Sequence, residues 1–262
     1  MPATEGSGAR IRYAESGNPS GPVLVLANSL GSNMHMWDKV LPEFQSKYRV
    51  VRFDMRGHGE SAVVPEPFTI EHLGRDVLRL LDELRTDRAN ICGLSLGGLV
   101  ALWLGIHTPT RVDRLIFANT AARIGSREMW DLRIGMVRNA GMSPLAVLML
   151  ERWFTASYRA QHPHEMERIR EMIAATHPAG YAACCAVLRD ADLRGEIGEI
   201  KVASLVITGK HDPATPPSDG RALHAGIRNS TYLELDCSHL SAWERAKEFA
   251  GAVLQHLAGG RA

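Results

Sequence analysis

Residues 91–98 read ICGLSLGG, and no other stretch of the chain says more about its fold. The apolar run that leads into it predicts a buried strand, and the apolar run that follows it predicts a helix. Ser95 therefore lies in a G-x-S-x-G turn from a strand into a helix. Such a turn needs small residues two positions before and after the serine, and Gly93 and Gly97 occupy those positions. This context predicts that Ser95 is a nucleophile.

Two backbone amides are candidates for stabilising the oxyanion that such a nucleophile would create. The N–H of Leu96 begins the predicted helix on the same side as the Ser95 hydroxyl, near the positive end of the helix dipole. A second donor should come from the loop after an early strand, and residues 28–31 follow the apolar run 23–27. We therefore predict an oxyanion hole formed by the backbone N–H groups of Leu30 and Leu96.

A serine hydroxyl needs a base to take its proton, and the base needs an acid to orient it. Asp212 follows a predicted strand at 204–208, and His239 follows another at 232–235. In a parallel sheet both loops emerge at the edge where ligands bind, beside the serine turn. We predict Asp212 as the acid and His239 as the base. His211 and Asp236 remain as competitors in the same two loops.

Strand and helix patterns alternate along most of the chain, which predicts an α/β fold with a mostly parallel, helix-covered sheet. Helical spacing is clear over residues 70–84 and 246–257, and Ser241 with Glu244 is a candidate capping box for the last helix. Short apolar runs predict the strands at residues 23–27, 48–53, 89–93, 115–118, 204–208 and 232–235.

The alternation stops between residues 122 and 198, where helical patterns follow one another. We interpret this segment as a helical cap, and residues 1–121 and 199–262 as the core domain. Flexible methionines and large rings suit the roof of an apolar pocket. The predicted substrate-binding residues come from the cap and are Trp130, Arg133, Met136 and Trp153. Trp130 and Arg133 share one helical face with Ile134 and Val137.

The composition excludes several classes of partner. The chain has 30 Lys and Arg residues against 29 Asp and Glu residues, a formal net charge of +1. This balance predicts no strongly basic surface that would bind nucleic acid or an anionic membrane. Residues 89–110 carry no Asp, Glu, Lys or Arg, but their Gly, Pro and polar residues favour a buried strand and helix over a membrane span. The four cysteines have no metal-type spacing, which predicts free thiols and no metal site.

Together these motifs resemble those of the α/β-hydrolase family along the whole chain. The resemblance rests on the oxyanion loop, on D-x-R-G-x-G-x-S at 54–61, on the serine turn, on G-x-x-D at 209–212 and on the terminal histidine. The amino-acid sequence at 93–98, 207–217 and 237–241 is similar to that of the 3-oxoadipate enol-lactonases of bacterial aromatic catabolism. The chain departs from many family members at residues 28–29, where Asn-Ser replaces His-Gly.

The resemblance implies the fold, the chemistry and the setting. It implies an α/β-hydrolase fold with a cap, no cofactor, a cytoplasmic enzyme of the β-ketoadipate pathway, and a small lactone substrate that carries a free carboxylate. It leaves the oligomeric state open. Such a substrate calls for a cation or several amide donors in the pocket, and the cap offers Arg123, Arg127, Arg133, Arg138 and Arg152. Of these we expect Arg133 to bind the carboxylate, because it shares its helix face with apolar residues.

Other functions remain open on the same residues. Another carboxylesterase or a C–C bond hydrolase would use the same triad under a different cap. A perhydrolase or acyltransferase would replace water with another acceptor. A non-catalytic ligand receptor on the same fold would use no triad at all, although the order Ser95, Asp212, His239 argues against it. Serine instead of aspartate at the turn argues against haloalkane dehalogenases and epoxide hydrolases.

Overall fold

The computed structural model of the chain describes residues 2–4, 8–64 and 67–259. The predicted core domain therefore includes a few positions that lie outside the described residues, namely 1, 5–7, 65–66 and 260–262.

A seven-stranded sheet runs through the molecule in the order β1-β3-β2-β4-β5-β6-β7. β1 pairs antiparallel with β3, and every other neighbouring pair is parallel, which confirms the prediction of a mostly parallel sheet. The strands are β1 Tyr13–Gly17, β2 Val23–Ala27, β3 Arg49–Phe53, β4 Ala89–Leu94, β5 Val112–Ala118, β6 Ser204–Gly209 and β7 Ser230–Leu235. β1 was not expected from the sequence, because this edge strand, YAESG, carries only a weak apolar signal and is partly exposed.

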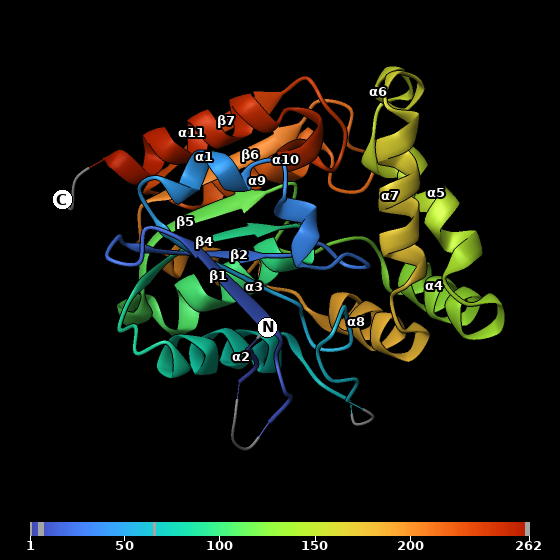
Figure 1. The fold of residues 1–262 in the computed structure, drawn as a ribbon, viewed down its shortest axis with the longest axis horizontal. Helices are drawn as coiled ribbons and strands as arrows, with labels where there is room; N and C mark the ends of the chain where they lie inside the picture. The colour runs from blue at the N-terminus through green and yellow to red at the C-terminus, as the bar shows by residue number, and fades with distance from the viewer. Residues whose placement is uncertain (1, 5–7, 65–66, 260–262) are drawn as a thin grey trace.

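Helices cover both faces of the sheet (Figure 1). α2 and α3 lie below the sheet in that view, and α1 and α11 lie above it. α3 is apolar on all sides because it is enclosed between the sheet and α2. The helices of this part are α1 Leu41–Gln45, α2 Ile70–Glu83, α3 Leu96–His107, α9 Pro217–Gly226, α10 Ser241–Glu244 and α11 Ala246–Ala258, with short 3₁₀ turns at Met34–Trp37, Pro109–Arg111 and Ile197–Glu199.

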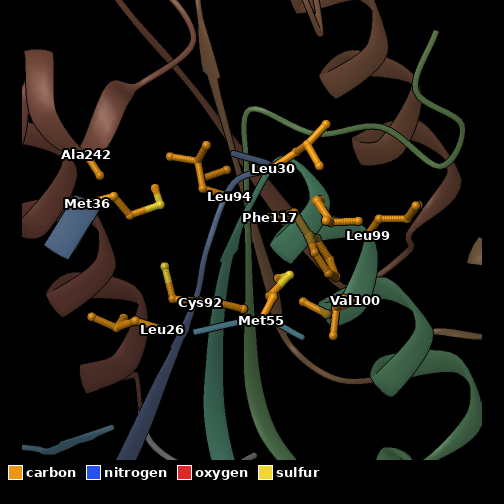
Figure 2. Packing of buried hydrophobic residues seen from close by; sticks show 14 of the residues in the cluster. Leu26, Leu30, Met36, Met55, Cys92, Leu94, Leu99, Val100, Phe117 and Ala242 are labelled. Atoms are coloured by element: carbon orange, nitrogen blue, oxygen red, sulfur yellow. The ribbon is translucent and has the colours of Figure 1, made fainter. Parts of the chain in front are cut away.

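The hydrophobic core packs against both sides of the central strands. Figure 2 shows Leu26, Met36 and Cys92 on one side, and Phe117 and Val100 on the other, towards α3. All of these side chains are buried, and each buried apolar side chain of this size contributes about 1.5–3 kcal/mol to folding. The carboxyl ends of the central strands are therefore held rigidly, which matters for the loops that follow them.

Between β5 and β6 the chain forms five consecutive helices. They are α4 Arg127–Ala140, α5 Ser143–Trp153, α6 Ala156–Gln161, α7 Pro163–Ala174 and α8 Pro178–Asp190. α4 packs on α8 and α5 packs on α7. Figure 1 shows α4–α7 gathered at one side of the molecule, beyond the sheet. We call residues 122–198 the cap; treating this segment as a separate unit stays a prediction.

The predicted capping box at the last helix is wrong. Ser241 and Glu244 form their own short helix, α10, and α11 begins only at Ala246. The side chains are engaged elsewhere: Ser241 Oγ donates to Asn119 Oδ1, and Glu244 accepts from Ser238 and Thr155. These tertiary bonds replace the local ones that the spacing suggested.

The charge-free stretch at 89–110 forms β4, α3 and the turn after it. Among residues 2–4, 8–64 and 67–259, no helix is both long and apolar enough to cross a membrane.

Candidate active site

Three neighbouring regions of the sheet edge carry the predicted catalytic residues. Ser95 follows β4, Asp212 follows β6 and His239 follows β7. These strands run parallel within the contiguous order β4-β5-β6-β7, so their carboxyl ends meet at one edge. The side chains are enclosed there, since Ser95, Asp212 and His239 are 6%, 3% and 2% exposed.

The turn at Ser95 is strained and tightly packed. Ser95 has φ 58° and ψ −114°, a conformation that a non-glycine residue adopts only where its surroundings impose it. A Cβ on Gly97 would lie 2.1 Å from the carbonyl oxygen of Ala27, so the turn sits against β2. The backbone of Ser95 is held on both sides of its Cα. Its N–H donates to the Ala118 carbonyl at 2.9 Å, and its carbonyl accepts from Thr120 Oγ1 at 2.7 Å.

Asp212 and His239 are in direct contact, as their predicted roles require. His239 Nδ1 lies 2.7 Å from Asp212 Oδ2. The carboxylate also accepts from Asn119 Nδ2 at 3.0 Å, from Thr215 Oγ1 at 2.8 Å and from the N–H of Ala214 at 2.8 Å. Burial by itself would raise the pKa of Asp212, but the charge and hydrogen bond of His239 and the other donors hold it below the ordinary value. The carboxylate is thus ionised and fixes the imidazole through Nδ1.

One narrow pocket brings Ser95 and His239 together with Leu30. Its free space is about 40 Å³, so the cap packs closely over these residues. In the part of the chain that the structure describes, no hydrogen bond joins Ser95 to His239. Such contacts are often long in unliganded enzymes and shorten when substrate binds.

The two predicted oxyanion donors remain available. Within the described residues, no protein acceptor bonds the N–H of Leu30 or of Leu96. Leu96 is the first residue of α3, where amides have no partner inside the helix. The loop that carries Leu30 is anchored instead by Asn28, whose Nδ2 donates to the Phe53 carbonyl at 2.7 Å while its Oδ1 accepts from Trp37. The departure from His-Gly at residues 28–29 therefore has its own buried bonding pattern.

The cap supplies most of the opposite wall. Trp130, Arg133 and Trp153 lie in the pocket lining, as their predicted roles require. Met136 does not, and this expectation is wrong: its side chain is 46% exposed and is absent from the lining. The reason is helical geometry, since Met136 is rotated away from Trp130 towards the solvent side of α4. The lining also includes Arg152, one of the five cap arginines considered for the carboxylate. Lining residues not predicted from the sequence are Ser29, Ile124, Met129, Met149, Leu188 and Ala214.

Two guanidinium groups face this pocket. Arg133 lies over the Trp130 ring, 5.6 Å from its centroid, and its Nη1 donates to the Tyr181 hydroxyl at 3.3 Å. Arg152 Nη2 donates to the Pro213 carbonyl at 3.4 Å. Among the described residues neither guanidinium forms an ion pair with a carboxylate. Burial, followed by the charge of Arg133, lowers the pKa of Arg152, as expected for two cations that share a small space.

The other cap arginines take surface positions. Arg123 pairs with Asp192 and Arg127 with Asp190, both at exposed sites, and Arg138 is exposed near the end of α4. All three are exposed to solvent, Arg123 in the loop before α4 and the other two on α4 itself. Arg152 could have been distinguished from them in the sequence only by its position beside Trp153.

The competing histidine and aspartate are separated from Ser95. His211 Nε2 lies 2.9 Å from Asp236 Oδ1, and both side chains are at least half exposed. They line a larger open cleft of about 530 Å³ that contains none of Ser95, Asp212 or His239. The structure therefore pairs each competitor with the other at the surface.

Asn119 was missed by sequence reasoning. It follows β5 directly, is fully buried and has φ 44°. Its Nδ2 donates both to Asp212 and to the Ser238 carbonyl, so it joins the acid loop to the histidine loop. Its place immediately after a strand, at the same sheet edge as the other site residues, was the available signal.

The D-x-R-G loop at residues 54–61 is held in place by buried polar contacts. Asp54 accepts from the N–H groups of Met34 and Glu60, and Arg56 forms a buried ion pair with Asp76 at 2.6 Å. Within the described residues, no group of three or more His, Cys, Asp or Glu is arranged to hold a metal ion.

Comparison with known proteins places these features in a family. Residues 22–246 match the family described as having the alpha/beta hydrolase fold. The chain is 41% identical to 3-oxoadipate enol-lactonase 2 of Acinetobacter baylyi over 93% of this chain and 91% of that protein. It is 35% identical to 3-oxoadipate enol-lactonase 1 of the same organism, over 94% and 92% of the two chains.

A solved structure has nearly the same architecture. The crystal structure of the enol-lactonase from Burkholderia xenovorans LB400 matches with a TM-score of 0.96 and 43% identity, covering 98% of this chain and 99% of the other. The match therefore covers nearly the whole of both chains.

Proposed function

The chain belongs to the α/β-hydrolase family, and from this premise we propose that it hydrolyses an enol-lactone bearing a carboxylate, 3-oxoadipate enol-lactone, to 3-oxoadipate. The observation that carries the proposal is the pair of guanidinium groups, Arg133 and Arg152, in the pocket that holds Ser95 and His239. The relatives named enol-lactonases support the choice of substrate. The place in bacterial aromatic catabolism follows from the resemblance of the sequence motifs.

The reaction begins with attack by Ser95 on the lactone carbonyl. Asp212 engages Nδ1 of His239, which leaves Nε2 to accept the Ser95 proton. The ionised carboxylate of Asp212 then stabilises the imidazolium that forms. The strained turn holds Ser95 at the end of β4 with little freedom, so little ordering is left for the reaction step.

The negative charge that develops on the carbonyl oxygen is placed between the amides of Leu30 and Leu96. Both N–H groups lack a protein acceptor among the described residues, so they are preorganised for this oxygen. Removal of one such donor typically costs about a hundredfold to a thousandfold in rate.

Collapse of the tetrahedral intermediate breaks the bond between the acyl carbon and the ring oxygen. The leaving group is an enolate, which takes the proton from the His239 imidazolium and tautomerises to the ketone, so His239 is neutral again for the next step. The acyl group remains as an ester on Ser95. Water activated by His239 then attacks this ester, releases the carboxylic acid and regenerates the serine.

The free carboxylate of the substrate is recognised by the cap. Arg133 and Arg152 can each donate charge-assisted hydrogen bonds to it, and neither donor is committed to a protein carboxylate. Trp130 and Trp153 provide apolar walls for the ring and chain. The cap thus selects a small anionic ester over a neutral one of the same size.

A substrate panel tests the proposal. Purified enzyme is assayed for loss of the enol-lactone, for hydrolysis of uncharged p-nitrophenyl esters, and for cleavage of diketone acids produced by ring fission. We expect kcat/KM for the lactone to exceed that for the other substrates by at least about a hundredfold, with all activity absent in Ser95→Ala. A preference for a diketone acid would replace the lactone as the substrate, and full activity in Ser95→Ala would remove the mechanism.

The role of Arg133 is tested in the same assay. Arg133→Ala should lose lactone activity and retain activity towards the uncharged ester, because only the lactone carries a carboxylate. An equal loss on both substrates would contradict the carboxylate role.

A further inference from the structure

The side chain of His58 links the D-x-R-G loop at 54–61 to the loop that carries Leu30. It lies in the D-x-R-G loop after β3 and is only 2% exposed. Its Nε2 accepts the N–H of Gly31 at 2.9 Å, and Gly31 is the residue after Leu30. Its Nδ1 lies 3.3 Å from the carbonyl oxygen of Arg56.

These two contacts define the tautomer of His58. The amide of Gly31 can only donate, so Nε2 must present a lone pair. The carbonyl of Arg56 can only accept, so Nδ1 must carry the proton. The neutral ring satisfies both partners, whereas the imidazolium would lose the bond to Gly31.

Burial favours the neutral ring. Desolvation lowers the pKa of His58 to about 4, against a smaller opposing effect of the Arg56 carbonyl. The neighbour on the cap side is Cys184, whose Sγ lies 3.9 Å from Nδ1, and burial raises the pKa of that thiol. The acceptor at Nε2 is therefore present throughout the neutral pH range.

Gly31 is also held from the cap. Its carbonyl accepts from Thr176 Oγ1 at 3.3 Å, and its backbone has φ +78°. A Cβ at Gly31 would lie 2.8 Å from Met149 Cε and 3.0 Å from Tyr181 Cε2, so cap side chains pack closely against this residue. Gly31 is thus fixed by His58 through its N–H and by Thr176 through its carbonyl.

We propose that His58 is a positioning residue for the oxyanion hole, which it orients through Gly31 so that the N–H of Leu30 points at the developing oxyanion. The inference rests on the proposed serine mechanism but not on the identity of the lactone. The Leu30–Gly31 peptide group is planar and moves as one unit. If the Gly31 N–H loses its acceptor, this unit can rotate and the backbone torsions of Leu30 change. The N–H of Leu30 then turns away from the oxyanion. A displacement of about 1 Å at such a site can cost about a hundredfold in rate.

Two substitutions at His58 separate positioning from simple filling of space. His58→Phe keeps a ring of similar shape but removes the acceptor. His58→Gln places an amide oxygen near the position of Nε2 and keeps the acceptor. His256→Phe is the control, since His256 is a largely buried histidine with a pKa lowered to about 4 in α11, away from the pocket.

The measurements are kcat and KM with p-nitrophenyl acetate and the inhibition constant of phenylboronic acid, whose tetrahedral adduct with Ser95 puts an oxygen in the oxyanion hole. We expect His58→Phe to lower kcat by about tenfold to a hundredfold and to raise the inhibition constant of phenylboronic acid by a similar factor. KM should change by less than about twofold. His58→Gln should recover most of both losses, and His256→Phe should leave both unchanged. Boronic acid affinity within about twofold of wild type in folded His58→Phe, or no recovery in His58→Gln, would overturn the proposal.

The tautomer of His58 can be measured on the wild-type protein, so this test does not depend on whether the Phe variant folds. The ¹⁵N resonances of the His58 ring at pH 7 should show a protonated Nδ1 and an unprotonated Nε2, and protonation at Nε2 would overturn the assignment. Because none of these readouts uses the lactone, a wild-type enzyme that hydrolyses p-nitrophenyl acetate but not the lactone would overturn the proposed substrate alone.

Discussion

The backbones of Gly93 and Gly97 meet across the turn that carries Ser95: a Cβ on Gly93 would lie 2.0 Å from the carbonyl oxygen of Gly97. The two residues flank Ser95 symmetrically, so their contact sets how sharply the chain turns from β4 into α3. A backbone carbonyl cannot move aside as a side chain can, because it is held in the helix that follows. The position of the nucleophile therefore depends on the absence of a single carbon atom.

Gly93→Ala should disturb both stability and activity. The added methyl group overlaps the Gly97 carbonyl, and we expect a loss of at least about 3 kcal/mol in the free energy of unfolding, with kcat/KM reduced about a hundredfold or more. Urea denaturation and ester hydrolysis measure the two effects. The matched control is Gly135→Ala in α4, where an added Cβ would meet nothing within 4 Å. This substitution should stabilise the helix by about 0.5–1 kcal/mol. Similar behaviour of the two variants would contradict the close contact at the turn.

Asp212→Asn should reduce kcat about a thousandfold or more while leaving the fold intact. The amide is nearly isosteric, but it carries no charge to stabilise the imidazolium and can present an N–H to His239 Nδ1, which favours the wrong tautomer. Asp236→Asn is the control, because Asp236 contacts the exposed His211. Steady-state kinetics with one ester substrate decide the matter: comparable losses in both variants would mean that the acid had been assigned to the wrong loop.

Arg152→Met should weaken binding of the lactone without affecting neutral esters. The thioether keeps the apolar contacts of the side chain and removes the charge, so we expect KM for the lactone to rise about tenfold and KM for p-nitrophenyl acetate to stay within about twofold. Arg127→Met, at an exposed ion pair in α4, serves as the control. A neutral ester that suffers as much as the lactone would show that Arg152 shapes the pocket instead of binding the carboxylate.

Acid should destabilise the protein through His58. The unfolded residue titrates near its ordinary value of 6.5 and the folded residue near 4, so between these values the unfolded chain binds the proton and the folded chain does not. The free energy of unfolding should therefore fall as pH drops through this window, by on the order of 3 kcal/mol from this residue. Urea denaturation of wild type and His58→Gln at several pH values tests it, and the variant should show a shallower decline. Parallel curves would mean that His58 is already protonated in the folded protein or exposed to solvent.

Glu244 should influence catalysis from outside the pocket wall. Its carboxylate accepts from the N–H of Ser238, next to His239, and from the N–H and hydroxyl of Thr155 in the cap. Glu244→Ala removes these acceptors, so we expect a loss of about 1–3 kcal/mol in the free energy of unfolding and a fall in kcat of about tenfold. Glu248→Ala, which breaks only an exposed ion pair in α11, is the comparison. Unchanged kcat in a destabilised Glu244→Ala would restrict Glu244 to holding the cap.

Local patterns were sufficient for the parts of the protein that depend on neighbours in sequence. The G-x-S-x-G turn, the order of Ser95, Asp212 and His239 after three strands, and a run of helices between residues 122 and 198 all follow from periodicity and turn chemistry. Trp130 and Arg133 were found in the same way, because residues three apart on a helix share a face.

The remaining features depend on how distant elements meet, and they could not be read from the chain. Met136 and Arg152 are both residues of cap helices, yet only Arg152 reaches the pocket, because the packing of α4 and α5 over the sheet edge decides which helix faces turn inward. Ser241 and Glu244 have capping-box spacing, but the loops beside them offered stronger partners.

The order of chemical groups at one edge of a parallel sheet follows from the local sequence, since strands and their turns are set by local propensity and hydrophobic burial. Which of these groups touch depends on the packing of elements that are distant along the chain. The bond of Asn119 to Asp212, the bond of His58 to Gly31, and the pocket that Arg133 and Arg152 line together with Ser95 each join residues far apart in sequence. Such contacts are fixed by the packing of whole elements, and no spacing along the chain encodes them.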